Sequence, residues 1–255
     1  MALCKTIDIG KVFMQNNVQN LLRDISRFKP ERVFRRRQVR RLKTPKIMLM
    51  SNEQLARAKE EAYLHAKARI QMPPVMSEAT AEPALLALDE DIVGYTNFRV
   101  MFIDISVGSS DRDRLMSVRE KDGRLREPTH EERSRLNHIF YPGEGRSIDT
   151  PKMFEEKRLM DLLRRKEYEF VLNRACIQFE PDDPRYVAIT SKVYDYIDRV
   201  GDYDMLRSTR HFGPMSLYLA RNKKTNGLIN DMITRNLVDD AVKLVRVGYE
   251  CLRIG

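Results

Sequence analysis

The sequence has no tryptophan, only three cysteines in 255 residues, and no run of 18 apolar residues. Cys4, Cys176 and Cys251 are far apart and odd in number, so they form neither a disulfide framework nor a CxxC metal-binding pair. This pattern is typical of a protein in a reducing compartment. Because the long apolar run is missing, we expect no membrane-spanning helix.

Motifs for catalysis and metal binding are also missing. His130-Glu131 resembles the start of a zinc-protease HExxH helix, but Ser134 replaces the second histidine and His138 lies about two turns away. The glycines of residues 143–146 lack the GK[ST] of a phosphate-binding loop, and there is no GxSxG serine-hydrolase motif. We therefore expect no catalytic residue, cofactor, metal or small-molecule substrate, and we predict that the chain is not an enzyme.

One feature present in the sequence is a concentrated block of basic residues. Residues 31–46 read ERVFRRRQVRRLKTPK, where six Arg and two Lys against one Glu give a net charge of +7, compared with +9 for the whole chain. The arginines cover more than one helix face, which suits a segment surrounded by phosphates. Guanidinium groups also bind phosphate through paired hydrogen bonds. The predicted RNA-binding residues are Arg35, Arg36, Arg37, Arg40, Arg41, Lys43 and Lys46.

Composition alone leaves other roles open for this basic block. A solvated helix, a nuclear import signal and part of a transit sequence have similar compositions. Smaller basic clusters occur later in the chain, where each can also be a solvated helix end. The secondary candidates for RNA or protein contact are Arg207, Arg210, Lys223 and Lys224.

Two helices are expected in the N-terminal third. In residues 15–28 an amphipathic helix is predicted by apolar residues at helical spacing, which are Val18, Leu21, Leu22, Ile25 and Phe28. Its apolar face needs a partner, so we expect residues 1–50 to be protease-sensitive in the free protein. Ser51-Asn-Glu-Gln54 is a capping box, and the helix that it begins should end near Gln71, before two prolines.

The middle of the chain combines a connector with short strands. Residues 70–98 contain acids but no Lys or Arg, which indicates an acidic connector. Residues 96–107 are rich in β-branched and aromatic side chains and predict a strand. The turn signal at Lys121–Gly123 predicts a β-hairpin. A second capping box, Thr129-His-Glu-Glu132, predicts a short helix to about Phe140.

From residue 150 onward the pattern is helical. Similar segments begin at Tyr168, Tyr203 and Val238, each 35 residues after the previous one, and this period suits stacked helical hairpins. Helix starts or turns are expected at Thr150-Pro151, Asp183-Pro184, Gly201 and Asn226-Gly227. Gly213-Pro214 should interrupt a helix. The predicted core or protein-contact residues are Leu206, Phe212, Met215, Leu217, Leu219, Leu228, Ile229 and Ile233.

These signals predict an α+β fold that is predominantly α-helical. It has an extended basic N-terminal arm, a small β-hairpin layer and C-terminal helical hairpins in a solenoid-like arrangement. We divide the chain into four parts. They are an arm with the amphipathic helix and the basic RNA-binding segment (1–50), a helix plus acidic connector (51–95), a small hairpin and helix unit (96–149) and a helical-hairpin domain (150–255).

Several long irregular segments resemble one known family. They are VQNLLRDISRF (18–28), AKARIQMPPVM (66–76), FEPDDPRY (179–186), YDMLRSTRHFGPMSLYLARNKKTNGLI (203–229) and LVDDAVKLV (237–245). In this order they resemble the mitochondria-specific ribosomal protein family S-twenty-two of the small subunit. None of these segments is by itself a functional motif.

The resemblance implies a structural role in the mitochondrion. A member of this family is part of the small ribosomal subunit in the mitochondrial matrix, contacts ribosomal RNA and neighbouring ribosomal proteins, and has no enzymatic role. The family is less arginine-dense in the 31–46 region, so RNA contact there is inferred from this sequence. The alternatives are a helical-repeat RNA-binding factor of the mitochondrion that acts on transcripts and, third, a nuclease-like enzyme.

Overall fold

The computed structural model describes residues 9–33, 47–78, 83–89, 91, 97–106, 108–111 and 113–253. The N-terminal half contains α1 (Ile9–Phe13), α2 (Asn16–Ser26), α3 (Pro30–Val33), α4 (Asn52–Arg69), β1 (Leu85–Leu88), β2 (Val100–Ile103), β3 (Met116–Arg119), β4 (Arg124–Arg126) and α5 (His130–Phe140). The C-terminal half contains the 3-10 helices η2 (Lys152–Phe154) and η3 (Tyr203–Met205), with α6 (Glu156–Arg164), α7 (Tyr168–Gln178), α8 (Pro184–Val200), α9 (Phe212–Arg221), α10 (Asn226–Thr234) and α11 (Val238–Arg253). The expected α+β fold with a helical majority is confirmed.

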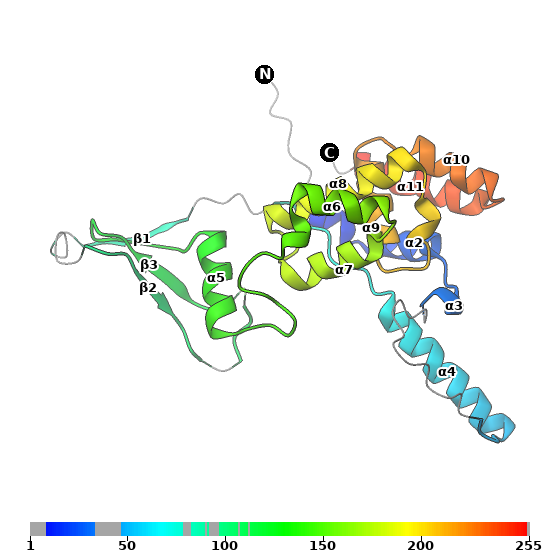
Figure 1. The fold of residues 1–255 in the computed structure, drawn as a ribbon, viewed down its shortest axis with the longest axis horizontal. Coiled ribbons are helices and arrows are strands. Elements are labelled where there is room, and N and C mark those ends of the chain that lie inside the picture. The colour runs from blue at the N-terminus through cyan, green and yellow to red at the C-terminus, as the bar shows by residue number, and fades with distance from the viewer. Residues whose placement is uncertain are drawn as a thin grey trace.

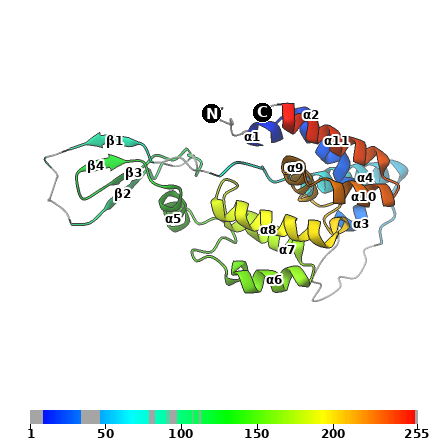
Figure 2. The same ribbon diagram turned by 90° about the horizontal axis from the view of Figure 1, so that it is seen from above.

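A helical body forms the largest part of the molecule, with the small sheet on one side and α4 projecting from the other (Figure 1). Helix α2 packs against both α9 and α11, which come from the opposite end of the chain (Figure 2). Its residues Val18, Leu22 and Ile25 are completely buried in the core shared with these helices. The predicted amphipathic helix is therefore confirmed. The expectation that its apolar face waits for an outside partner is wrong, because the chain supplies that partner itself.

We expect hydrogen exchange in the free protein to separate α2 from α4. The amides of α2 should exchange slowly because the helix is held in the core, whereas α4 is exposed along nearly its whole length and should exchange quickly. Mass spectrometry of peptides covering residues 16–26 and 52–69 measures both rates. Fast exchange throughout α2 would contradict the packing described here.

The capping signals position two helices as predicted. Ser51 begins α4 and Thr129 begins α5, and both capping boxes are complete, with the side chain at the third helical position bonding back to the cap. In α4, however, Ala66 is the one buried residue. The rest of α4 is exposed or half-exposed in the free chain.

The four strands form an antiparallel sheet in the order β1-β4-β3-β2. The predicted hairpin turn is confirmed, with Gly123 in the left-handed region at φ 79°. Helix α5 is held to the sheet by Arg126, which donates to Glu120 and Glu132 at 2.7–2.9 Å. These bonds hold the pKa of Glu132 down at about 2, chiefly through the Arg126 guanidinium. Strand β1 lies within the expected acidic connector and was not predicted. A run of four apolar residues has no periodicity by which a strand can be recognised.

The 35-residue period coincides with turns between helices. Lys166, Gly201 and Asn236 follow α6, α8 and α10, and all three adopt the left-handed conformation, with φ of 60°, 81° and 57°. In each case a new helical segment begins two residues later. Helices α6, α7 and α8 lie in successive layers (Figure 2), as expected for stacked hairpins.

Two of the predicted helix boundaries are wrong. Thr150-Pro151 is followed by η2, and the α-helix itself begins later, at Glu156. Asn226-Gly227 lies inside α10, and the turn before that helix is made by Lys223, whose φ is 57°. The predicted start at Asp183-Pro184 is confirmed, since the Asp183 carboxylate caps α8 by accepting from the Arg185 amide.

The predicted C-terminal core is confirmed except at its end. Leu206, Leu228 and the predicted positions of α9 are buried, Ile229 is half-buried, and Ile233 is 51% exposed. The Gly213-Pro214 pair predicted that no single helix runs from residue 203 to 222. In the structure η3 ends at Met205 and α9 begins at Phe212. Both residues lie in the first turn of α9, where proline costs no hydrogen bond.

Replacing Gly213 with alanine should destabilise the body. A Cβ at this position would overlap the Met72 sulfur and lie 3.4 Å from Leu22 Cβ, so the Met72 side chain must move, and the net cost after the gain in helix propensity is about 1 kcal/mol. Gly248→Ala in α11 is the matched control. No atom of the described residues lies within 4 Å of its added methyl group, so it should raise stability by up to about 1 kcal/mol. Urea unfolding measures both, and shifts of the same sign would contradict this packing.

Candidate functional site

The structure places the predicted contact residues in different environments. The primary set, from Arg35 to Lys46, lies outside the described residues. Lys223 and Lys224 are exposed, and Lys224 donates to Asp195 at 2.9 Å. Arg210 is half-buried and lines a groove. Arg207 is only 1% exposed, so this candidate for outside contact interacts with the chain's own acids instead.

Arg207 is the centre of an ion-pair network that joins distant segments. Its guanidinium nitrogens lie 3.4–3.6 Å from the carboxylates of Asp204, Asp231 and Asp240. Burial lowers the pKa of Arg207, and the three acids act in the opposite direction. No local sequence signal pairs an arginine with acids 24 and 33 positions later, so sequence analysis missed this network.

The same acids hold the segment that leads into the basic block. Arg27 Nε donates to Asp240 at 2.7 Å, and its backbone has a φ of 51°, in the left-handed region. Arg32 donates to the carbonyl oxygen and the carboxylate of Asp204 at 2.7 and 2.6 Å. The chain up to the end of α3 is therefore fixed to the body just before Arg35, the first of the predicted RNA-binding residues, in the sequence.

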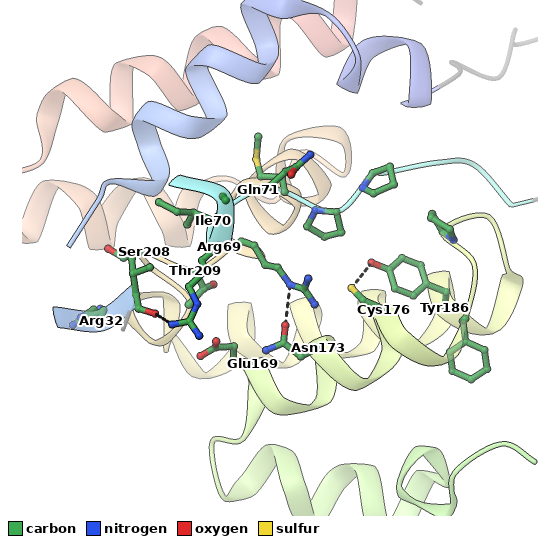
Figure 3. Close-up of a pocket in the computed structure, with 18 residues that line it drawn as sticks. Arg32, Arg69, Ile70, Gln71, Glu169, Asn173, Cys176, Tyr186, Ser208 and Thr209 are labelled. Carbon is green, nitrogen blue, oxygen red and sulfur yellow. Dashed lines mark hydrogen bonds between the residues drawn. The ribbon is translucent and has the colours of Figure 1, made fainter. Parts of the chain in front are cut away.

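A groove of about 650 Å³ lies beside this fixed segment (Figure 3). Its walls are the end of α4 with residues 70–74, one side of α7, and residues 208–210. Arg32 and Val33 line the same groove. Asn173 and Ser208, which are 35 residues apart, occupy equivalent positions of successive repeats and both line it. The groove is thus a junction between repeats, open next to the start of the basic block.

Asn173 organises the polar side of the groove. Its Oδ1 accepts from Arg210 Nε and from His211 Nε2, both at 2.9 Å. His211 is fully buried, and this burial, with the nearby Arg210 charge, lowers its pKa to about 3. The imidazole is therefore neutral at physiological pH and carries its proton on Nε2. The sequence pointed to the basic cluster of Arg210 and His211 but not to Asn173, because the role of Asn173 depends on where these two side chains lie.

The groove is basic in character. Besides Arg210, it is lined by Arg32 and by Arg69, whose Nη1 donates to the Val33 carbonyl at 3.4 Å. Of the described lining residues, Glu169 alone is acidic. Within the described ranges no group of three potential metal ligands occurs, and no helix there is long and apolar enough to span a membrane. The arrangement offers hydrogen-bond donors and positive charge, which suit an anionic ligand.

Comparisons with known proteins agree on one family. The family model described as "Mitochondrial 28S ribosomal protein S22" matches residues 11–252. Small ribosomal subunit protein mS22 of Bos taurus is 40% identical over 253 residues, covering 97% of this chain and 70% of the relative. The Mus musculus protein of the same name is 39% identical over 237 residues, covering 93% of this chain and 66% of the relative. The chain thus spans about two thirds of the length of these relatives.

Proposed function

The chain belongs to the mitochondrial 28S ribosomal protein S22 family, and from this membership we propose that it is a structural component of the small subunit of the mitochondrial ribosome. The observation that carries the proposal is the family match, which extends over residues 11–252 and therefore over nearly all of the described chain. The protein then works in the mitochondrion by holding RNA and protein neighbours together. It performs no chemical reaction.

Ribosomal RNA is the proposed partner of the basic block. A net charge of +7 over sixteen residues supports phosphate contact, because each neutralised phosphate releases condensed counterions. The ion pairs of Arg27 and Arg32 support it further, since they fix the chain to the body a few residues before Arg35 in the sequence. Arg35, Arg36, Arg37, Arg40, Arg41, Lys43 and Lys46 would then grip the RNA backbone and set the position of the body on it.

Neighbouring ribosomal proteins are the proposed partners of the apolar surface. Large apolar side chains are exposed on β1 and β2, with Leu85 at 60% and Phe102 at 47% exposure. Residues 47–50 are four consecutive exposed apolar residues at the start of the projecting α4 segment. Apolar surface of this extent is typical of protein contact sites. In the particle these side chains would be covered.

The 35-residue repeat favours a second candidate function. Stacked helical hairpins present extended surfaces that read single-stranded RNA in other proteins, so a mitochondrial factor acting on transcripts is the alternative. Sucrose-gradient sedimentation of mitochondrial extracts that contain the tagged full chain distinguishes the two. The proposal expects stoichiometric co-migration with the small subunit. Migration with light transcript-containing fractions, away from the subunit, would favour the alternative.

A further inference from the structure

We propose that the groove between α7 and residues 208–210 binds a backbone phosphate of single-stranded RNA through Arg210 and Asn173. The inference rests on the proposed RNA-binding function and assigns it a second site, separate from the basic block. Arg210 Nε donates to Asn173 Oδ1 at 2.9 Å, and Figure 3 shows Asn173 on the α7 side of the groove.

Besides the Glu169 carboxylate, the groove contains hydrogen-bond donors that are still available to a ligand. Asn173 Oδ1 already accepts two hydrogen bonds, which leaves the amide NH₂ as the group available to a ligand. Arg210 donates to Asn173 through Nε, and His211 Nε2 lies 3.4 Å from the same nitrogen. The two terminal nitrogens of Arg210 have no hydrogen-bond partner among the described residues. An amide NH₂ next to a guanidinium fork matches the oxygens of a phosphate.

These donors are held in place before a ligand arrives. Nε2 of the buried, neutral His211 faces Asn173 Oδ1, which can only accept, so the imidazole donates from Nε2 and fixes the orientation of the amide. Asn173 in turn holds the Arg210 guanidinium at Nε. Because the donors are ordered in the free protein, binding loses less side-chain entropy.

The position and the size of the groove favour one kind of anion. Arg32 and Val33 line the groove and come just before Arg35, the first of the predicted RNA-binding residues, in the sequence, which favours one extended polyanion as the ligand of both sites. A space of about 650 Å³ between two chain segments admits a phosphate with its nucleotide but not a duplex. These features favour single-stranded RNA over an acidic protein segment.

The test uses the full chain and a fluorescently labelled single-stranded oligouridylate, with anisotropy measured over a salt series. Arg210→Gln is expected to weaken binding about tenfold and to reduce the slope of log K against log salt by about 0.7, the value for one single-strand phosphate. Asn173→Asp keeps the shape but places a carboxylate beside the phosphate, and is expected to weaken binding at least as much. Arg199→Gln, an exposed arginine near the end of α8, is the control with equal charge loss and should change little.

The outcomes separate the groove from the basic block. If Arg210→Gln behaves like Arg199→Gln while replacement of the block arginines weakens binding, the groove proposal is wrong and the proposed function stands. If Arg210→Gln weakens binding of a glutamate-rich peptide but not of the RNA, the partner is an acidic protein and the inference is overturned. Circular dichroism checks folding. If Arg210→Gln unfolds the chain, two other variants test whether the groove binds RNA. They are Asn173→Asp and Arg210→Lys, which keeps the charge but loses the paired donors of the guanidinium group.

Discussion

Asp240→Ala is expected to lower the free energy of unfolding by about 3 kcal/mol, because it leaves the buried Arg207 charge undercompensated. Arg207 is 1% exposed and Asp240 is 3% exposed, so solvent cannot replace the lost carboxylate. Asp240 also accepts from Arg27 at 2.7 Å, which means that the same change releases the end of α2. Denaturant unfolding followed by circular dichroism measures the effect.

Asp239→Ala is the matched control for this prediction. Asp239 is the preceding residue in the first turn of α11, carries the same charge and experiences the same helix dipole, but is exposed. Its removal should change stability by about 0.5 kcal/mol or less. Equal effects of the two substitutions would show that the network around Arg207 does not stabilise the fold.

Replacing the five block arginines with alanine is expected to abolish most of the salt dependence of RNA binding. For about five phosphate contacts, the wild-type slope of log K against log salt should be roughly −3.5 to −4.5, and the variant should have a much shallower slope. The full chain is needed, because α2 lies in the core with α9 and α11 and would lose that packing in an N-terminal fragment. The substituted residues are Arg35, Arg36, Arg37, Arg40 and Arg41.

Two further measurements sharpen this prediction. Changing the same five residues to lysine keeps the charge, so the slope should be retained while the paired hydrogen bonds are lost. The unfolding transition of the helical body should not change in either variant. Equal slopes for the wild type and the alanine variant would mean that the block does not contact phosphate, and a targeting or solubility role would replace this interpretation.

Local signals predicted the fold where chemistry acts over a few residues. The capping residues Ser51, Thr129 and Asp183 all begin helices, since a cap needs only its own first turn. The turn predicted at Asn226-Gly227 was wrong, and the reason is packing. A Cβ at Gly227 would collide with the Tyr203 hydroxyl, so this glycine reflects close packing rather than a turn.

Long-range packing could not be predicted from the sequence. The partner of α2 lies about 200 residues later in the chain, and periodicity shows only that an apolar face exists. The same limit applies to the candidate site. Arg207 and Arg210 are three positions apart in one basic cluster, yet the first is buried among acids and the second lines the groove. Which arginine points inward depends on acids that are distant in sequence.

We propose that this chain connects RNA to the protein part of the mitochondrial small subunit, and a cryo-EM map of that particle would show both contacts. We predict density for the chain at full occupancy, with the side chains of residues 35–46 within hydrogen-bonding distance of ribosomal RNA phosphates. The exposed apolar residues of β1 and β2 should lie against another protein. A particle that lacks the chain, or one in which residues 35–46 contact only protein or solvent, would contradict the account.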